Sequence, residues 1–323
     1  EAVFDDCYSG NPLVNVLCLG VLPRERLVLA RAEGEGNLAV LLGASTGRDG
    51  IGGASVLASA GFQEGSQEKR PSVQVGDPFE EKKLIEACIE LLDAGLAVGV
   101  QDLGAAGLSC AASETAAKAG VGMDVDIARV PQREPGMNSV EVMTSESQER
   151  MLAIVLPENL DEVVELCRRW EVRANVVGRV TDSGRFRVFD GAFDTWGVPG
   201  SAAVVLPRAL DSVADSLADV PVESLGDGPV YRRTMMRPSG QDALQEADPW
   251  VEIEPRLASN GDDLSSELLA LLSTPTIADK SWIWRQYDHQ LFLNTVVGPG
   301  GDATVLRLKG TQKALALAVD GNA

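Results

Sequence analysis

The order of apolar and polar positions predicts strands and helices that follow one another through the first 206 residues. Residues 38–43 are apolar without a break, which is typical of a buried strand. Residues 78–92 place apolar side chains three and four positions apart, which predicts an amphipathic helix with Asp77 as its N-cap. The same patterns predict further strands at 12–21, 96–100, 123–127 and 151–156, helices at 108–118 and 158–170, and a hairpin made of 176–180 and 186–189.

The pattern changes after about residue 206. Residues 207–280 are rich in Asp, Glu, Ser and Pro and contain one clear helical stretch, at 265–272, so they are predicted to form a poorly structured connector. Strand patterns return at 293–297, 303–308 and 314–319, as at the start of another domain. Because the chain does not begin with Met and ends in a predicted strand and turn, we expect it to be a piece of a longer protein.

Composition and charge exclude some classes of partner. Apolar residues make up 45% of the chain and charged residues 24%, which is normal for a globular protein. The formal net charge of −20 argues against binding to a nucleic-acid backbone, which needs a basic face. No apolar window is long enough for a membrane span, and nothing at the start of this sequence resembles a signal peptide, so we expect a cytoplasmic protein without a membrane partner.

The cysteines lack the spacing of a metal site. None forms a Cys-x-x-Cys pair, and their number is odd, so we expect reduced, buried thiols with structural roles. The five are Cys7, Cys18, Cys88, Cys110 and Cys167.

A glycine-rich stretch, Gly43–Ser55, follows the predicted strand at 38–43. Backbone amides without side chains can approach phosphate oxygens closely, so this stretch is a candidate phosphate-binding loop. It matches neither the Walker A pattern nor a clean Gly-x-Gly-x-x-Gly, and a plain glycine turn remains the alternative.

Asp102 stands directly after a predicted strand and before a glycine turn. A carboxylate in this position can hold Mg²⁺ through one oxygen while phosphates and waters supply the other ligands. The alternative is that Asp102 caps the helix that follows.

Neutral polar side chains form two further candidate groups. Gln74 lies among alternating apolar residues, and Glu146-Ser147-Gln148 precedes the strand predicted at 151–156. Amides and hydroxyls suit a ribose or amide ligand, but they can equally hold loops together. His289, the single histidine, is interpreted as structural.

Several short blocks, in this order and spacing, resemble one family closely. The family is the phosphoribosylformylglycinamidine synthases of purine biosynthesis, which belong to an ATP-using superfamily with aminoimidazole ribonucleotide synthetase. The blocks are Thr46-Gly-Arg-Asp-Gly-Ile-Gly-Gly53, Ser72-Val-Gln-Val-Gly-Asp-Pro-Phe79, Val100-Gln-Asp-Leu-Gly-Ala-Ala-Gly107, Val130-Pro-Gln-Arg-Glu134, Ser145-Glu-Ser-Gln-Glu-Arg150 and Gln286-Tyr-Asp288.

The resemblance implies an α/β (α+β) fold like that of aminoimidazole ribonucleotide synthetase, with a mixed sheet and flanking helices, from an internally duplicated protein. Residues 1–25 would end a first N-type domain, and residues 26–206 would form a C-type α+β domain. Residues 207–285 would be the connector, and residues 286–323 would start a second N-type domain.

The resemblance also implies an activity. Members of the family are ligases that convert formylglycinamide ribonucleotide to the formylglycinamidine with ATP and ammonia, which a glutaminase subunit supplies with the help of a small bridging subunit. Carried over, Asp102 would hold Mg²⁺, and the ribonucleotide would contact Gln74, Glu146, Ser147 and Gln148. A second nucleotide, ADP bound structurally, would contact Gly43, Thr46, Gly47, Arg48, Asp49, Gly50, Gly52, Gly53 and Asp320.

One family feature is missing. The block of His-Asn-His-Pro type that carries the catalytic histidine does not occur, so the chain contains no expected catalytic residue and should be inactive alone. Two alternatives remain. Another member of the superfamily, such as a selenophosphate synthetase or a hydrogenase-maturation protein, would lack Gln74 and Glu146-Ser147-Gln148. A non-catalytic nucleotide-binding or scaffold module would use only the glycine loop.

Overall fold

The computed structural model describes residues 2–9, 14–53, 74–191, 216–226, 232, 234–248, 251 and 264–319. The chain divides into two compact units. The larger is Cys18–Tyr231, and the smaller combines Glu1–Leu17 with Arg232–Ala323. Three parts of the candidate regions lie outside the described residues: residues 54–55 of the glycine-rich stretch, residues 72–73 of the block at 72–79, and Asp320.

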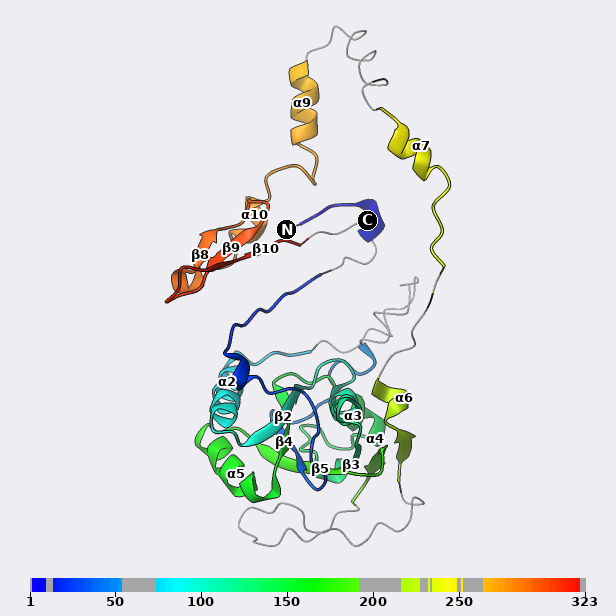
Figure 1. Ribbon diagram of the computed structural model, residues 1–323, viewed down its shortest axis with the longest axis vertical. Coiled ribbons are helices and arrows are strands. Elements are labelled where there is room, and N and C mark those ends of the chain that lie inside the picture. The colour runs from blue at the N-terminus through cyan, green and yellow to red at the C-terminus, as the bar shows by residue number, and fades with distance from the viewer. Residues whose placement is uncertain are drawn as a thin grey trace. The chain divides into compact units, whose positions relative to one another are not determined.

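A seven-stranded mixed sheet forms the centre of the larger unit (Figure 1). Its strand order is β2-β4-β1-β5-β3-β6-β7, and every neighbouring pair is antiparallel except β3 with β6. The strands are β1 (Leu38–Gly43), β2 (Ala97–Asp102), β3 (Gly122–Asp126), β4 (Arg150–Val155), β5 (Ala174–Thr181), β6 (Arg185–Phe189) and β7 (Ala218–Pro221). The helices are α2 (Pro78–Asp93), α3 (Gly107–Ala119), α4 (Ser139–Thr144), α5 (Leu160–Arg169) and α6 (Glu223–Gly226), with 3₁₀ turns at Arg24–Arg26, Ile127–Arg129 and Pro157–Asn159. This arrangement confirms the predicted α/β fold with a mixed sheet and flanking helices.

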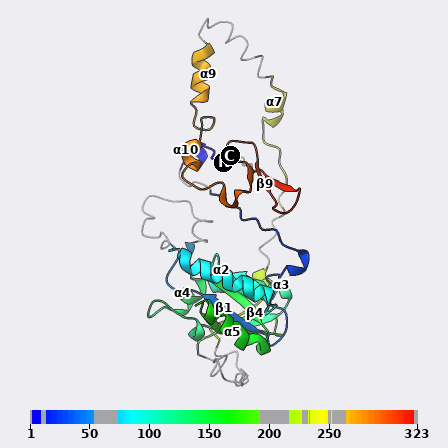
Figure 2. The same ribbon diagram turned by 90° about the vertical axis from the view of Figure 1, so that its left-hand side faces the viewer.

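Strand β1 shows how the sheet separates two apolar cores. Its six residues are all buried, and successive side chains point to opposite faces. Leu41 packs in the core formed with α3 and α4, whereas Val40 packs in the core formed with α2 and α5. Figures 1 and 2 show these helix pairs on the two faces of the sheet. Burial on both faces explains why the strand is apolar without a break.

The predicted N-cap of α2 is confirmed. The carboxylate of Asp77 accepts hydrogen bonds from the backbone N–H groups of Phe79 and Glu80, at 3.0 and 3.1 Å. Helix α4 was not predicted, although Asn138 and Glu141 form a capping box at its start. Its six residues are too short to show a helical repeat in the sequence.

The predicted hairpin of residues 176–180 and 186–189 is wrong. The two strands exist, as β5 and β6, but β3 lies between them in the sheet. Asp124 on β3 is fully buried and binds Arg187 of β6 at 2.7 Å and Arg179 of β5 at 3.3 Å. One buried carboxylate thus joins three strands across the position where a two-stranded turn was expected.

The predicted buried strand at 12–21 is also wrong within the described residues. Residues 14–21 form no strand, and Val14, Val16 and Leu19 are exposed. β-type composition gives a preference only, because a strand also needs a neighbour with which to form hydrogen bonds.

The predicted connector is ordered in part. Residues 218–221 form β7, which pairs with β6, and Val222 is buried against α3 in the core. A poorly structured connector from residue 207 is therefore wrong for residues 218–226. The predicted helix at 265–272 is confirmed as α9 (Leu264–Leu272).

The smaller unit contains a three-stranded antiparallel sheet in the order β10-β9-β8. Its strands, β8 (Thr295–Val297), β9 (Thr304–Arg307) and β10 (Ala314–Leu317), confirm the three predicted after residue 286. Its other elements are α7 (Gln241–Glu246), α9, α10 (Ser281–Trp284) and 3₁₀ turns at Asp6–Tyr8 and Leu291–Leu293. The His289 ring packs edge-on against Trp284, with ring centroids 4.9 Å apart, which suits the structural role predicted for it.

Four cysteines are free thiols in unequal surroundings. Cys167 is buried, Cys88 and Cys110 are half-buried, and Cys18 is exposed, so the expectation of burial was wrong for Cys18. Burial raises the pKa of Cys88 to about 11 and that of Cys167 to about 12, which keeps both protonated at neutral pH. None of the helices described is both long and apolar enough to cross a membrane.

Candidate functional site

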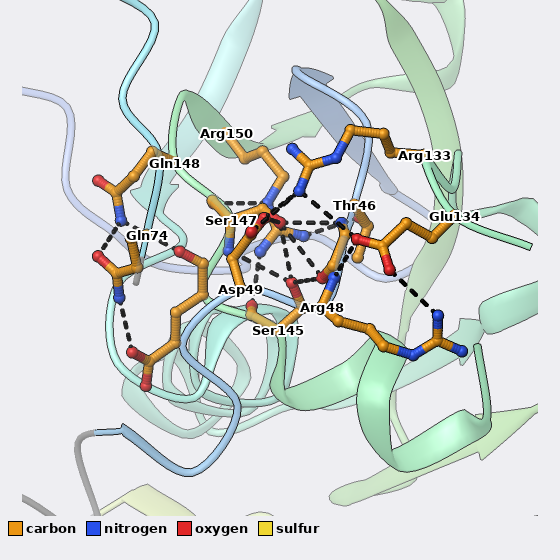
Figure 3. Close-up of polar contacts among 12 residues, drawn as sticks. Thr46, Arg48, Asp49, Gln74, Arg133, Glu134, Ser145, Ser147, Gln148 and Arg150 are labelled. Atoms are coloured by element: carbon orange, nitrogen blue, oxygen red, sulfur yellow. Dashed lines mark hydrogen bonds and ion pairs between the residues drawn. The ribbon is translucent and has the colours of Figure 1, made fainter. Parts of the chain in front are cut away.

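Two loops meet at one end of the sheet. Loop 44–50 follows β1 and loop 145–149 precedes β4, and the antiparallel pairing of Gly43 with Arg150 brings them side by side. The N–H of Glu146 donates to the carbonyl of Asp49 at 2.8 Å, and the N–H of Gly47 donates to Ser147 Oγ at 2.9 Å. Figure 3 shows the polar side chains that converge there.

The buried Arg150 side chain forms hydrogen bonds with both loops. The residue is 3% exposed, and its guanidinium donates to Thr46 Oγ1 at 2.8 Å, to the Ser147 carbonyl at 2.9 Å and to the Ser145 carbonyl at 2.6 Å. Burial lowers the pKa of Arg150 to about 10, which leaves the side chain charged at neutral pH. The loops are therefore held by a buried cation whose donors are matched with fixed acceptors.

Asp49, near the end of loop 44–50, links this loop to Arg133 and Ser147. Its carboxylate accepts two hydrogen bonds from Arg133 Nη2, at 2.9 and 2.7 Å, and a further one from Ser147 Oγ. The Ser147 hydroxyl, in a residue 2% exposed, thus donates to Asp49 and accepts from Gly47. Ser147 therefore joins the loops and is not directed at solvent.

Arg48 attaches loop 44–50 to α4. Its guanidinium donates to Glu141 at 3.0 Å, to Glu134 at 3.1 Å and to the Gly136 carbonyl at 2.8 Å. Hydrogen bonds with the two carboxylates raise the pKa of Arg48, and hydrogen bonds from Arg48 lower the pKa of Glu134 and Glu141.

The glycines of loop 44–50 are needed for close approach within the protein. Gly50 has a φ of +60°, and a Cβ there would lie 2.7 Å from both Gln74 Nε2 and Glu146 Oε2. A Cβ on Gly47 would collide with the Arg133 guanidinium. These contacts explain both glycines without a bound phosphate. The assignment of a nucleotide to the loop stays a prediction.

The four residues predicted to bind substrate lie together. Gln74 Nε2 donates to Glu146 Oε2 at 2.8 Å, and Gln148 Nε2 donates to Gln74 Oε1 at 2.8 Å. Gln74 is exposed and Gln148 half-buried, whereas Glu146 and Ser147 are buried beneath them. The two amides therefore form the outer layer of the group (Figure 3).

Asp102 ends β2 at the same end of the sheet. It pairs with Met151 of β4, and after it Leu103 N–H donates to the Arg150 carbonyl at 3.2 Å. Helix α3 has Ala106 as its N-cap and no side-chain cap, so the alternative role of Asp102 as a helix cap is wrong.

The carboxylate of Asp102 could supply one ligand to a metal ion. It is exposed, and Gln101 Nε2 donates to Oδ1 at 2.8 Å, while Oδ2 accepts no hydrogen bond from the residues described. No group of three or more metal-binding side chains occurs within the described ranges. An ion held by Asp102 would therefore take its remaining ligands from phosphates and water, as Mg²⁺ often does.

Sequence reasoning assigned no role to Arg133, Arg150 or Ala106. The N–H of Ala106 donates to Glu146 Oε1 at 3.0 Å, and both Ala106 and Glu149 have left-handed backbones, with φ of 55°. Backbone strain of this kind tends to collect at functional sites. The one sequence signal was an arginine directly before the strand predicted at 151–156.

Comparisons with known proteins identify the family to which the chain belongs. Residues 34–191 match the family described as AIR synthase related protein, C-terminal domain. The chain is 50% identical to the phosphoribosylformylglycinamidine synthase subunit PurL of Parafrankia sp. and 47% identical to that of Thermobifida fusca, each over the whole chain and 40% of the relative. It therefore spans about two fifths of the length of these curated relatives.

Solved structures show the same relationship. The PurLQS structure from Thermotoga maritima matches with a TM-score of 0.62 and 30% identity, over 90% of this chain and 39% of that one. T. maritima PurL complexed with FGAR matches with a TM-score of 0.60 and 30% identity, over 88% of this chain and 39% of that one. The sequence thus belongs to the family of phosphoribosylformylglycinamidine synthase PurL subunits, with an AIR synthase related C-terminal domain at residues 34–191.

Proposed function

We infer that this chain contributes part of the site at which formylglycinamide ribonucleotide (FGAR) is amidated with ATP and glutamine-derived ammonia in purine biosynthesis. The observation that carries this proposal is the group of Gln74, Glu146 and Gln148 at the same end of the sheet as Asp102. It lies in a segment 45–50% identical to proteins named as the synthase subunit. Solved structures exist of T. maritima PurL complexed with ATP and with FGAR.

The proposed reaction belongs to ligase chemistry. ATP transfers its γ-phosphoryl group to the amide oxygen of FGAR, ammonia adds to the amide carbon, and phosphate leaves as the C–N bond is completed. Such reactions depend on positioning and charge neutralisation more than on a protein nucleophile. Asp102 would hold Mg²⁺, which neutralises phosphate charge when bound, and the two glutamine amides would orient the ribonucleotide.

Other parts of the proposal concern the rest of the protein. We expect the catalytic histidine to come from outside these 323 residues, because His289 packs on Trp284. A glutaminase subunit and a small bridging subunit would deliver ammonia in the cytoplasm. A structural ADP on Gly43–Gly53 would have to bind beside the side chains of Thr46 and Asp49, which already have partners.

The test is ammonium-dependent release of ADP by a full-length PurL polypeptide that carries this segment. Release that requires FGAR is the expected result, and the isolated 323-residue chain should show none. ADP release that is independent of FGAR would contradict the proposal and favour a relative with another acceptor. Nucleotide binding without turnover in the full-length protein would favour the scaffold alternative.

Asp102→Asn should raise the KM for Mg-ATP at least roughly tenfold in the same assay, because it removes the anionic oxygen offered to the metal. The melting temperature should change by less than about 2 °C, since Asp102 caps no helix and is exposed. Asp182→Asn is the matched control: Asp182 is also exposed after a strand, but β5 ends at the opposite end of the sheet. A fall in melting temperature large enough to account for the loss of activity in Asp102→Asn would contradict the metal-binding role.

A further inference from the structure

Both oxygens of the Glu146 carboxylate have donors that fix their positions. The Ala106 N–H donates to Oε1 at 3.0 Å, and Gln74 Nε2 donates to Oε2 at 2.8 Å. Glu146 is 6% exposed, and Gly50 lies so close to its contact with Gln74 that a Cβ there would collide with both side chains. The carboxylate therefore has little freedom to turn toward a ligand.

A carboxylate can only accept hydrogen bonds, so it determines which way the next amide faces. Gln74 must direct its nitrogen at Glu146, and its oxygen then faces Gln148. Gln148 in turn must direct its nitrogen at Gln74, as the 2.8 Å contact shows.

The backbone of Glu146 imposes the same order from the other end. Gln148 Nε2 also donates to the Glu146 carbonyl at 3.1 Å, and a backbone carbonyl is likewise only an acceptor. Both hydrogens of the Gln148 amide nitrogen are thus engaged, and its Oε1 accepts no hydrogen bond from the part of the chain described. The amide oxygen of Gln148 is the group left for a ligand.

We propose that Glu146 is a positioning residue that fixes the donor–acceptor order of Gln74 and Gln148, so that Gln148 offers an acceptor to an N–H or O–H group of the substrate. The proposal rests on the proposed function, because it concerns how the same site reads a ribonucleotide that carries amide N–H and ribose O–H groups. It assigns Glu146 a role beneath the substrate, whereas the outer amides make the contact.

Glu146→Gln tests the order without changing the size of the side chain. The Ala106 N–H requires an oxygen at the position of Oε1, so the new nitrogen must take the position of Oε2 and face Gln74 Nε2. Two N–H donors, on residues 146 and 74, then face each other. If the Gln74 amide turns over to avoid this, its nitrogen faces the nitrogen of Gln148 instead. With the order of hydrogen bonds reversed, the Gln148 oxygen is no longer held toward the ligand.

The double variant Gln74→Glu with Glu146→Gln should restore the order. The new amide at position 146 would donate to one oxygen of the new carboxylate at position 74. The other oxygen of that carboxylate would accept from Gln148 Nε2, as the amide oxygen of Gln74 does now. Net charge is the same as in the original chain, so the double variant isolates the order of donors and acceptors. Glu165→Gln, on an exposed residue of α5, controls for loss of a carboxylate elsewhere.

In the full-length polypeptide, Glu146→Gln should raise the KM for FGAR at least roughly tenfold while the KM for ATP changes less than about twofold. It should also lower the melting temperature by about 3–6 °C. The double variant should return the melting temperature to within about 2 °C of the original and the KM for FGAR to within about threefold. A merely structural role would change the stability and leave the KM for FGAR unmoved.

The two measurements separate the possible failures. A double variant no more stable than Glu146→Gln would overturn the assigned order of donors and acceptors. Recovery of stability without any effect of Glu146→Gln on the KM for FGAR would overturn the role of Gln148 toward substrate. If the original protein showed no dependence on FGAR, the proposed function would fail, whereas the stability cycle would still decide the order.

Discussion

Arg150→Met lowers the free energy of unfolding by an expected ~3–5 kcal/mol, because it leaves three buried acceptors without a donor. Those acceptors are Thr46 Oγ1 and the carbonyls of Ser145 and Ser147. A buried acceptor that loses its partner costs about 1–3 kcal/mol, and methionine fills the space of the side chain without supplying a hydrogen bond. The change should also release loop 145–149 and abolish FGAR-dependent activity.

Urea unfolding of the chain, followed by circular dichroism, measures this effect. Arg168→Met is the matched control, since Arg168 is largely exposed in an ion pair with Glu165 and should contribute less than about 1 kcal/mol. Arg150→Lys keeps the charge but cannot reach three acceptors, so its stability should fall between those of the other two. A loss in Arg150→Met no greater than in Arg168→Met would show that the buried contacts do not hold the loops.

Most single elements of the larger unit could be predicted because their signals are local. Helix α2 shows its N-cap, its proline and its apolar repeat within one short stretch, Asp77 to Asp93. Strand β1 is recognisable because both of its faces are buried, which leaves an unbroken apolar run. Such signals do not depend on which neighbour the element meets.

The order of the strands could not be predicted from these signals. Chain neighbours β5 and β6 suggested a hairpin, but the sheet places β3 between them, and buried Asp124 of β3 forms ion pairs with Arg179 and Arg187. Nothing within the turn sequence reveals a partner so far away in the chain. The ordered residues of β7 were missed for the same reason, because their strand character depends on pairing with β6.

The sequence indicated that the candidate residues belong to one group, but not which of them are buried; their role toward a ligand stays a prediction. The resemblance brought Gln74, Glu146, Ser147 and Gln148 into one group, and the structure places them together. Which of them is buried depends on loop 44–50, which is distant in the chain from loop 145–149. Arg150 shows the same limit, because its sequence position reveals a charge before a strand but not the acceptors that surround it.

Gly107→Ala should lower the free energy of unfolding by about 2–5 kcal/mol, because it combines an unfavourable backbone with a collision. Gly107 has a φ of +53°, where a residue with a Cβ costs about 1–2 kcal/mol. The added Cβ would also lie far inside van der Waals contact of the Ser145 carbonyl, and relieving that overlap costs typically about 1–3 kcal/mol. Since this carbonyl accepts from Arg150 and the neighbouring Ala106 N–H binds Glu146, FGAR-dependent activity should fall as well.

Gly120→Ala separates the two causes, because Gly120 ends the same helix with a φ of +70° but has open space where a Cβ would lie. Its substitution should cost only the backbone term, about 1–2 kcal/mol, and should leave the KM for FGAR unchanged. The difference between the two variants in urea unfolding therefore measures the collision with the Ser145 carbonyl. If Gly107→Ala were no less stable than Gly120→Ala, α3 would not be seated against loop 145–149 as closely as the structure shows, and the support of Glu146 by Ala106 would lose its basis.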